Sequence, residues 1–254
     1  MRISGLADIA SQFGGMLIDQ FGVIHDGQAL YAGTLRVLSE LMAMGIPVAV
    51  MTNSGKRAAA NSQRLVSMGV PRGHFVDAIS SGEVAYQCLA NTRAFLIGRP
   101  GEEYGFDNVV LVDNPQEADV ILIAGTDAPR TTLADYARLL AGLKLPAICC
   151  NPDKLMLTPQ GLLPAPGAIA ALYEDMGGQV TWIGKPYPAI YQRARAVIGN
   201  PARVLCIGDS AEHDVAGGRA AGLATLLVMT GISTGLDAAM AEPQPDFWMD
   251  NFEW

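Results

Sequence analysis

Four short groups of polar residues each follow an apolar run in this sequence. In chain order the groups hold Asp19; Thr52, Asn53 and Ser54; Lys185; and Asp209 with Asp214. Carboxylate oxygens suit a hard cation such as Mg²⁺, and hydroxyl, amide and ammonium donors suit the oxygens of a phosphoryl group. A carboxylate can also act as a nucleophile toward phosphorus. The set therefore indicates phosphoryl chemistry if the four groups meet in one crevice.

Each group alone has an ordinary explanation. A Thr-Asn-Ser run after a strand is usually a helix cap, and a single lysine is usually solvated. Open α/β sheets, however, bind ligands at the carboxyl ends of their strands. Because all four groups follow apolar runs, we expect them to converge at such an edge.

The apolar runs are nearly continuous in Val, Ile and Leu, which is typical of parallel strands buried on both faces. The expected strands are Met16–Gln20, Ile46–Thr52, Ala94–Gly98, Val109–Val112, Val120–Ala124, Ala147–Cys150, Val180–Ile183, Val204–Ile207 and Thr225–Met229. Helical patterns lie between them, so right-handed crossovers and a layered α/β sheet are predicted.

One helix and one loop illustrate the intervening segments. In "GTLRVLSELMAMG" the residues Leu35, Leu38 and Met42 are predicted to form the apolar face, and Gly45 to end the helix. The segment Asn151–Gly167 is rich in turn residues and has few helix or strand signals. Long loops inside compact domains are often functional, although a solvated connector explains this one equally well.

Composition narrows the class of protein. The chain of 254 residues has a net charge of −8 and no Lys/Arg cluster, so neither nucleic acid nor an anionic membrane is an expected partner. Its N-terminus lacks the apolar run of roughly 7–15 residues of a signal peptide. The cysteines (Cys88, Cys149, Cys150, Cys206) lack metal-ligand spacing and are predicted to be buried free thiols. These features predict a cytoplasmic protein.

The ordered set of polar groups resembles the four motifs of the haloacid dehalogenase (HAD) superfamily. The resemblance is most specific in "GKPYPAIY" (184–191) and "GDSAEHDVAGGRAAG" (208–222). The long stretch between Thr52 and Lys185, "IHDG" after the first motif and "NPD" within the insert resemble subfamily IIA. Members of that subfamily include sugar- and nucleotide-phosphate phosphatases.

The resemblance implies an α/β fold with a Rossmann-like core of parallel strands and helices on both faces. The core is expected over residues 1–80 and 181–254, with an inserted α/β cap domain over 81–180. Asn151 and Asp153 are the candidate substrate-facing residues of that cap. The aromatic C-terminal segment "DFWMDNFEW" is expected either to pack on the core or to form a homodimer contact.

The resemblance also implies a role for each matching residue. Asp19 is the nucleophile that becomes an aspartyl-phosphate. The Thr52 hydroxyl and the Asn53 backbone N–H bind phosphoryl oxygens, with Ser54 beside them, and Lys185 neutralises the nucleophile and the transferring group. The Mg²⁺ ligands are Asp19, the backbone carbonyl of Phe21 and Asp209, and Asp214 supports the metal either as a direct ligand or through the residues around it.

Phe21 departs from the family pattern. Phosphatases of this superfamily carry a second aspartate there, which protonates the leaving group and then activates water. A phenyl ring does neither, and general acid–base catalysis is typically worth about 10²–10⁴-fold. The prediction is a slow Mg²⁺-dependent hydrolase of a small phosphorylated metabolite that retains cation and phosphate binding. His25, Asp26 and His213 are the candidate surrogate acids, and a structural role is favoured for the "HD" pair.

Three other functions compete with this one. Dehalogenases of the superfamily carry an aromatic residue at the Phe21 position, but they lack the acidic pair kept here as Asp209 and Asp214. A site without its acid could also serve a phosphate-binding regulatory protein. "GISTG" (231–235) fits the elbow of serine hydrolases, yet no histidine follows Ser233, so a glycine-rich turn is favoured.

Overall fold

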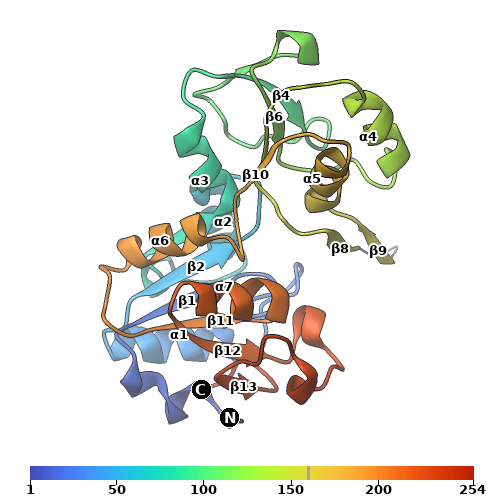
Figure 1. The fold of residues 1–254 in the computed structure, drawn as a ribbon. Coiled ribbons are helices and arrows are strands. Elements are labelled where there is room, and N and C mark those ends of the chain that lie inside the picture. Colours follow the sequence, from blue (N-terminus) through green and yellow to red (C-terminus); the bar gives the residue numbers. More distant parts are fainter. Residues whose placement is uncertain (159–160) are drawn as a thin grey trace. The chain divides into compact units, whose positions relative to one another are not determined.

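The computed structural model describes residues 1–158 and 161–254. The chain forms two compact units (Figure 1). The first unit contains Met1–Thr52, Ala59–Ile79 and Lys185–Trp254, and the second contains Asn53–Ala58 and Ser80–Gly184. Within the described ranges, no helix has the length and apolar character that crossing a bilayer requires.

A six-stranded sheet in the order β13-β12-β11-β1-β2-β3 forms the centre of the first unit. Its strands are β1 (Gly15–Asp19), β2 (Val48–Thr52), β3 (Asp77–Ser80), β11 (Val204–Gly208), β12 (Ala224–Val228) and β13 (Phe247–Met249). β1 pairs in parallel with β11 and β2, and β12 pairs in parallel with β11 and β13. β1 and β11 are buried along their whole length, which explains their unbroken apolar runs.

Helices α1 and α6 lie on opposite sides of this sheet (Figure 1). The helices of the unit are α1 (Thr34–Ala43), α2 (Ala58–Ser67), α6 (Pro188–Val197) and α7 (Ala216–Ala220), with a π-helical turn at Ala211–Val215. Short 3₁₀ turns occur at Leu6–Asp8, Ala10–Gln12, Arg72–His74, Gly231–Ser233 and Ala238–Met240.

The predicted apolar face of α1 is wrong. Leu38 is buried as expected, but its buried neighbours are Val37 and Leu41. Leu35 and Met42 are 44% and 52% exposed. Residues 37, 38 and 41 follow the i, i+1, i+4 spacing of one helical face as well as the predicted set does. The sequence offered two overlapping apolar faces, and only packing on the sheet distinguishes them.

A separate parallel sheet organises the second unit, in the order β10-β7-β6-β4-β5. Its strands are β4 (Arg93–Ile97), β5 (Val110–Leu111), β6 (Val120–Ile123), β7 (Ala147–Cys149) and β10 (Val180–Trp182). The helices of this unit are α3 (Ser81–Cys88), α4 (Leu133–Leu140) and α5 (Pro166–Asp175), and a 3₁₀ turn spans Pro115–Glu117. Ile121, Ile123 and Tyr173 lie in its core.

The expected loop over Asn151–Gly167 is only partly a loop. β8 (Leu155–Thr158) and β9 (Gly161–Pro164) form an antiparallel hairpin within it, and α5 begins at Pro166. Residues 159–160 lie outside the described residues. The pairing was hidden because "LMLT" and "GLLP" are short and show no clean alternation.

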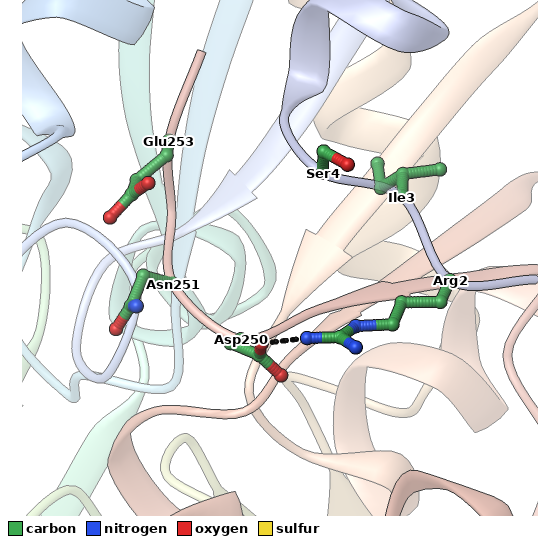
Figure 2. Close-up of a pocket in the computed structure, with 6 residues that line it drawn as sticks. All are labelled: Arg2, Ile3, Ser4, Asp250, Asn251 and Glu253. Carbon is green, nitrogen blue, oxygen red and sulfur yellow. Dashed lines mark hydrogen bonds and ion pairs between the residues drawn. The ribbon is translucent and has the colours of Figure 1, made fainter.

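The two ends of the chain lie side by side in the first unit. Arg2 forms an ion pair with Asp250 at a shallow hollow of about 410 Å³ that Ser4 and Glu253 also line (Figure 2). None of the predicted site residues lines this hollow. Met249 and Phe252 belong to the core, so the aromatic C-terminal segment packs there, while dimerisation stays a prediction.

The thiols follow the prediction at three of four positions. Cys149, Cys150 and Cys206 are buried and free. Cys88, at the end of α3, is exposed. The sequence pattern around Cys88 gave no indication of this, because its helix is only weakly amphipathic.

Candidate active site

Asp19 lies at the carboxyl end of the central strand β1, and its carboxylate is buried. Its Oδ1 atom accepts a hydrogen bond from the backbone N–H of Gln20 at 2.7 Å. The same oxygen lies 2.6 Å from the Nζ atom of Lys185, which is also buried. Both contacts hold Oδ1, so Oδ2 is the oxygen left to act on a ligand.

Two more carboxylates meet Asp19 from the neighbouring strand β11. Asp209 follows that strand directly, and Asp214 belongs to the π-helical turn after it. One carboxylate oxygen from each of Asp19, Asp209 and Asp214 lies within 4.8 Å of the others, and all three residues are buried. The Asp214 carboxylate also contacts Lys185 Nζ at 2.8 Å and accepts from the Ser210 N–H at 3.2 Å.

The charge of this cluster is unbalanced. Three ionised carboxylates face one ammonium group, which leaves two negative charges in a buried space. Buried charges without compensation are costly, and a divalent cation with oxygen ligands would neutralise both. The donor set therefore fits a hard divalent cation at Asp19, Asp209 and Asp214.

The pKa values of these groups show the same imbalance. Burial raises the pKa of Asp209 to about 6, and the charge of Asp214 adds to this effect. Burial also raises the pKa of Asp19, with Asp214 and Asp209 adding to the shift and Lys185 opposing it. Burial alone would lower the pKa of Lys185, but Asp19 and Asp214 raise it above its usual range. Lys185 therefore stays protonated, and its single positive charge does not balance the three carboxylates.

Close packing at Gly208 explains how Asp214 reaches the cluster. A Cβ atom on Gly208 would lie 1.9 Å from Asp214 Cγ, a distance that no real contact permits. The glycine at the end of β11 is thus required by the carboxylate that folds back over it. The Tyr191 hydroxyl, from α6, fixes the same turn by donating to the His213 carbonyl at 2.8 Å.

Lys185 reaches the cluster by a route that differs from the prediction. We expected "VTWI" to be a strand of the same sheet, with Lys185 at its carboxyl end. β10 instead pairs with β7 in the second sheet, and Lys185 is the first residue after the chain returns to the first unit. The apolar run was recognised correctly, but periodicity does not say which sheet a strand joins.

The predicted Thr-Asn-Ser group divides between the units. Thr52 ends β2 and is half-buried. Asn53 and Ser54 belong to the second unit. There the Asn53 side chain donates to Asp153 Oδ1 at 2.8 Å and accepts from the Ser81 hydroxyl at 3.3 Å. The Asn53 side-chain amide is thus held within the second unit by Asp153 and Ser81.

Asn151 and Asp153 lie together beside Asn53 in the second unit. Asn151 Oδ1 accepts from the Asp153 backbone N–H at 3.2 Å. The Asp153 carboxylate in turn holds Asn53. The structure therefore brings the predicted residues together as two groups, one around Asp19 and one around Asp153, each within its own unit.

Phe21 and His25 lie in the loop that follows Asp19 along the chain. The Phe21 ring is 42% exposed and lies edge-on to His25, with centroids 5.8 Å apart. His25 is buried, and its Nδ1 atom accepts from the Gly27 N–H at 2.9 Å. The neutral ring therefore carries its proton on Nε2, which lies 3.1 Å from the side-chain amide of Gln20.

This arrangement makes His25 a structural residue. The buried Gln20 Oε1 atom has no hydrogen-bond partner in the orientation described. Rotating the side-chain amide by 180° would place Oε1 where it accepts the proton of His25 Nε2. Burial lowers the pKa of His25 to about 4, and Arg64 adds to this effect. Both ring nitrogens are engaged and the ring is neutral at pH 7. His25 is thus not placed to replace a missing acid.

The turn Gly231–Ser233 contributes to the site in a way that its sequence does not predict. The glycine-rich turn favoured for "GISTG" agrees with the observed 3₁₀ turn. Its backbone N–H at Ile232 donates to Asp209 Oδ2 at 2.8 Å. Gly231 and Asp209 lie far apart in the sequence and meet only in the folded chain. Local sequence spacing therefore does not reveal this contact.

Comparison with known proteins agrees with this geometry. A family model described as haloacid dehalogenase-like hydrolase matches residues 16–111, and one described as HAD-hydrolase-like matches residues 182–254. A hydrolase of the haloacid dehalogenase-like family from Brucella suis has 28% sequence identity and a TM-score of 0.87, covering 98% of this chain and 99% of that chain.

Two further relatives carry more specific names. A dihydroxyacetone phosphatase of Corynebacterium glutamicum is 29% identical over 85% of this chain and 81% of its own length. A glycerol phosphate phosphatase of Mycobacterium tuberculosis, solved in complex with calcium, has 27% identity and a TM-score of 0.73 over 96% of this chain and 75% of that one. The chain belongs to the HAD superfamily of hydrolases, in the subfamily IIA group, and the fold predicted from its motifs is confirmed.

Proposed function

We propose that the protein is a Mg²⁺-dependent phosphatase of small phosphorylated metabolites, acting through an aspartyl-phosphate on Asp19. The observation that carries this proposal is the buried cluster of Asp19, Asp209 and Asp214 around Lys185. Such a cluster needs a divalent cation for charge balance, and it holds one carboxylate at the end of the central strand. A solvated acidic surface would need neither burial nor an ammonium partner.

The chemistry would proceed in two displacements at phosphorus. Asp19 Oδ2 would form a bond to phosphorus as the ester oxygen leaves. Water would then attack phosphorus, release inorganic phosphate and restore the carboxylate. Lys185, held on Asp19 Oδ1, would reduce the repulsion between the anionic nucleophile and the anionic substrate. Thr52 and the backbone N–H of Asn53 would hold the phosphoryl oxygens.

Mg²⁺ would be held by Asp19, Asp209, Asp214 and the backbone carbonyl of Phe21. When bound, it would supply Lewis-acid stabilisation of charge on the phosphoryl oxygens, which is worth several kcal/mol. Burial of the three carboxylates supports this assignment, because it makes the uncompensated cluster unfavourable.

Phe21 limits the reaction that we propose. An alkoxide leaving group needs a proton, and the attacking water must lose one. Neither Phe21 nor the neutral, fully engaged His25 can transfer that proton. Turnover should therefore be slow for alkyl phosphates and faster for aryl or acyl phosphates, whose leaving groups need no proton.

Small phosphorylated sugars are the favoured substrate class. Relatives named dihydroxyacetone phosphatase and acid sugar phosphatase support this choice. We propose that the second unit is the cap that selects the substrate, with Asn151 and Asp153 as its polar residues. A cytoplasmic location and a homodimer stay predictions.

A phosphate-binding regulatory protein is the second candidate. The observation that favours it is the absence of a proton-transfer group at Phe21 and His25, both described above. Such a protein would keep the cation and phosphate sites and release its ligand unchanged.

A screen of phosphate esters with and without Mg²⁺ tests the proposal. We expect Mg²⁺-dependent release of phosphate that disappears in Asp19→Asn. Asp175→Asn is a matched control, because Asp175 is an exposed carboxylate at the end of α5 and makes the same charge change. Tight binding of phosphate esters with no turnover in any of them would favour the regulatory protein instead.

A further inference from the structure

The turn after β12 holds Asp209 through two different atoms. The backbone N–H of Ile232 donates to the carboxylate Oδ2 at 2.8 Å. The Ser233 hydroxyl donates to the Asp209 backbone carbonyl at 2.6 Å. Ser233 is only 4% exposed. The turn therefore fixes both the backbone and the side chain of this aspartate.

Two glycines enclose the same carboxylate oxygen. A Cβ atom on Gly231 would lie 1.9 Å from Asp209 Oδ2, and one on Gly22 would lie 2.0 Å from it. Both glycines have positive φ, at +53° and +89°. A hydrogen atom is the largest substituent that fits on either side, so Oδ2 has one position in this packing.

The turn also holds the loop that carries Phe21. The Thr230 hydroxyl donates to the Gly22 backbone carbonyl. The Gly22 N–H in turn donates to the His25 carbonyl at 2.9 Å. Two proposed cation ligands on different loops, the Asp209 carboxylate and the Phe21 carbonyl, are thus tied to a single turn.

We infer that the Thr230–Ser233 turn is a positioning element of the cation site, with Ser233 and Thr230 as its positioning residues. It occupies Asp209 Oδ2, leaves Oδ1 for the cation, and fixes the distance between the Asp209 loop and the Phe21 loop. The inference rests on the proposed function only for the identity of the cation. It also gives Ser233 a role other than that of a nucleophile, because its proton is committed to a backbone carbonyl.

A pair of glycine substitutions tests the inference in the full-length protein, with MgCl₂ titrated calorimetrically into each variant. Gly231→Ala places a methyl group against Asp209 Oδ2. Gly235→Ala, in the same segment, has a similar left-handed backbone at φ +78° but open space around its Cβ position. Both variants strain the backbone, and only the first displaces the carboxylate. We expect Gly231→Ala to weaken Mg²⁺ binding at least about tenfold and Gly235→Ala to leave it within about twofold of the wild type.

Hydroxyl substitutions give a second test if Gly231→Ala does not fold. Ser233→Ala and Thr230→Val should each weaken Mg²⁺ binding about three- to tenfold, the effect of one net hydrogen bond. Ser233→Thr and Thr230→Ser keep the hydroxyl and should restore binding. Thr225→Val is the control. The buried Thr225 hydroxyl lies near the start of β12, away from the turn that follows the end of this strand, and it donates to the Asp246 carboxylate. This substitution should lower stability without changing Mg²⁺ affinity.

The outcomes separate this inference from the proposed function. Selective loss of Mg²⁺ affinity in Gly231→Ala and Ser233→Ala supports the inference even if no phosphate ester is hydrolysed, in which case only the proposed function fails. Wild-type affinity in all turn variants overturns the inference. A wild-type protein that binds no Mg²⁺ overturns it as well.

Discussion

The charged cluster around Asp19 and the aromatic loop that follows it are built differently, and we call them the charged side and the aromatic side of Asp19. On the charged side, Lys185, Asp209 and Asp214 are buried and held by at least two polar contacts each. On the aromatic side, Phe21 is half-exposed and the His25 ring is neutral with both nitrogens engaged. In the function that we propose, the charged side binds a cation and phosphate, and the aromatic side supplies no proton.

This difference separates two functions that a phosphatase normally combines. Electrostatic stabilisation needs fixed charges, and here close packing against glycines fixes the carboxylates of Asp209 and Asp214. Proton transfer needs a titratable group near the operating pH, and His25, whose pKa is lowered to about 4, does not meet this condition. A chain can therefore keep ligand binding and lose rate at a single position.

The largest expected effect concerns the charged side. Asp209→Asn removes one cation ligand, so Mg²⁺-dependent turnover should fall by about two orders of magnitude or more, the equivalent of the several kcal/mol that a metal contributes. Steady-state kinetics with Mg²⁺ titration measures this. Glu212→Gln, an exposed carboxylate in the adjoining turn, is the control with the same charge change.

Asp209→Asn also tests the charge argument directly. Because the variant relieves repulsion among buried carboxylates, its metal-free form should unfold at a temperature at least as high as that of the wild type. A lower unfolding temperature in the absence of metal would contradict the imbalance that we describe.

A packing change should produce the next largest effect. Gly208→Ala places a Cβ atom 1.9 Å from Asp214 Cγ, and overpacking of this kind costs about 1–3 kcal/mol of the free energy of unfolding. Urea denaturation measures it. Gly73→Ala in the same unit has nothing within 4 Å of the new atom and should be nearly neutral. Equal stability of the two variants would show that Asp214 can lie elsewhere.

The aromatic side can be probed at His25. His25→Ala leaves the Gly27 N–H and the buried Gln20 amide without a partner, at a cost of about 1–3 kcal/mol in stability. Relative rates across phosphate esters should stay the same, because His25 transfers no proton. A selective loss of alkyl phosphate turnover would make His25 the surrogate acid and refute its structural role.

The smallest expected effect is a pH dependence of cation binding. Without metal, the pKa of Asp209 is raised to about 6 and that of Asp19 is also raised, so protons compete with the cation at both carboxylates. Mg²⁺ affinity should therefore be at least about twofold lower at pH 6 than its value well above that pH. Calorimetric titrations at pH 6 and pH 7.5 compare the two, and a pH-independent affinity would contradict the shift.

Linkage gives the sign for the metal-free protein. Between the ordinary pKa of 3.8 and about 6, the folded state binds more protons at Asp209 than the unfolded state does. The free energy of unfolding should therefore fall as pH rises through this window. His25 acts oppositely: its pKa is lowered to about 4, so its contribution is present above the ordinary value of 6.5 and is lost toward pH 4. Measuring the free energy of unfolding of Asp209→Asn and His25→Ala as a function of pH separates the two contributions.

Much of this arrangement could be predicted from the sequence. Apolar runs such as Met16–Gln20 and Val204–Ile207 correspond to β1 and β11, because burial on both faces leaves little freedom in composition. Asp19 and Asp209 follow these two runs, and their meeting in one cluster could be predicted because parallel strands bring their carboxyl ends to one edge.

The remainder depends on contacts between distant segments. The local sequence does not predict that β10 joins the second sheet, nor that Lys185, three residues after it, belongs to the first unit. The Leu35 face of α1 was as apolar as the Val37 face, and only packing on the sheet decides between them. The role of Gly231 beside Asp209 arises from two segments that meet only in the folded chain.

The leaving-group dependence of turnover tests the central claim most directly. The measurement compares kcat/KM for phosphate esters of graded leaving-group acidity, with saturating Mg²⁺, in the wild type, Phe21→Asp and the matched control Phe21→Asn. We expect a steep dependence in the wild type and in Phe21→Asn. Phe21→Asp should flatten it by raising alkyl phosphate turnover about 10²–10⁴-fold. A wild-type protein that hydrolyses alkyl and aryl phosphates equally well would contradict the division between the two sides of Asp19.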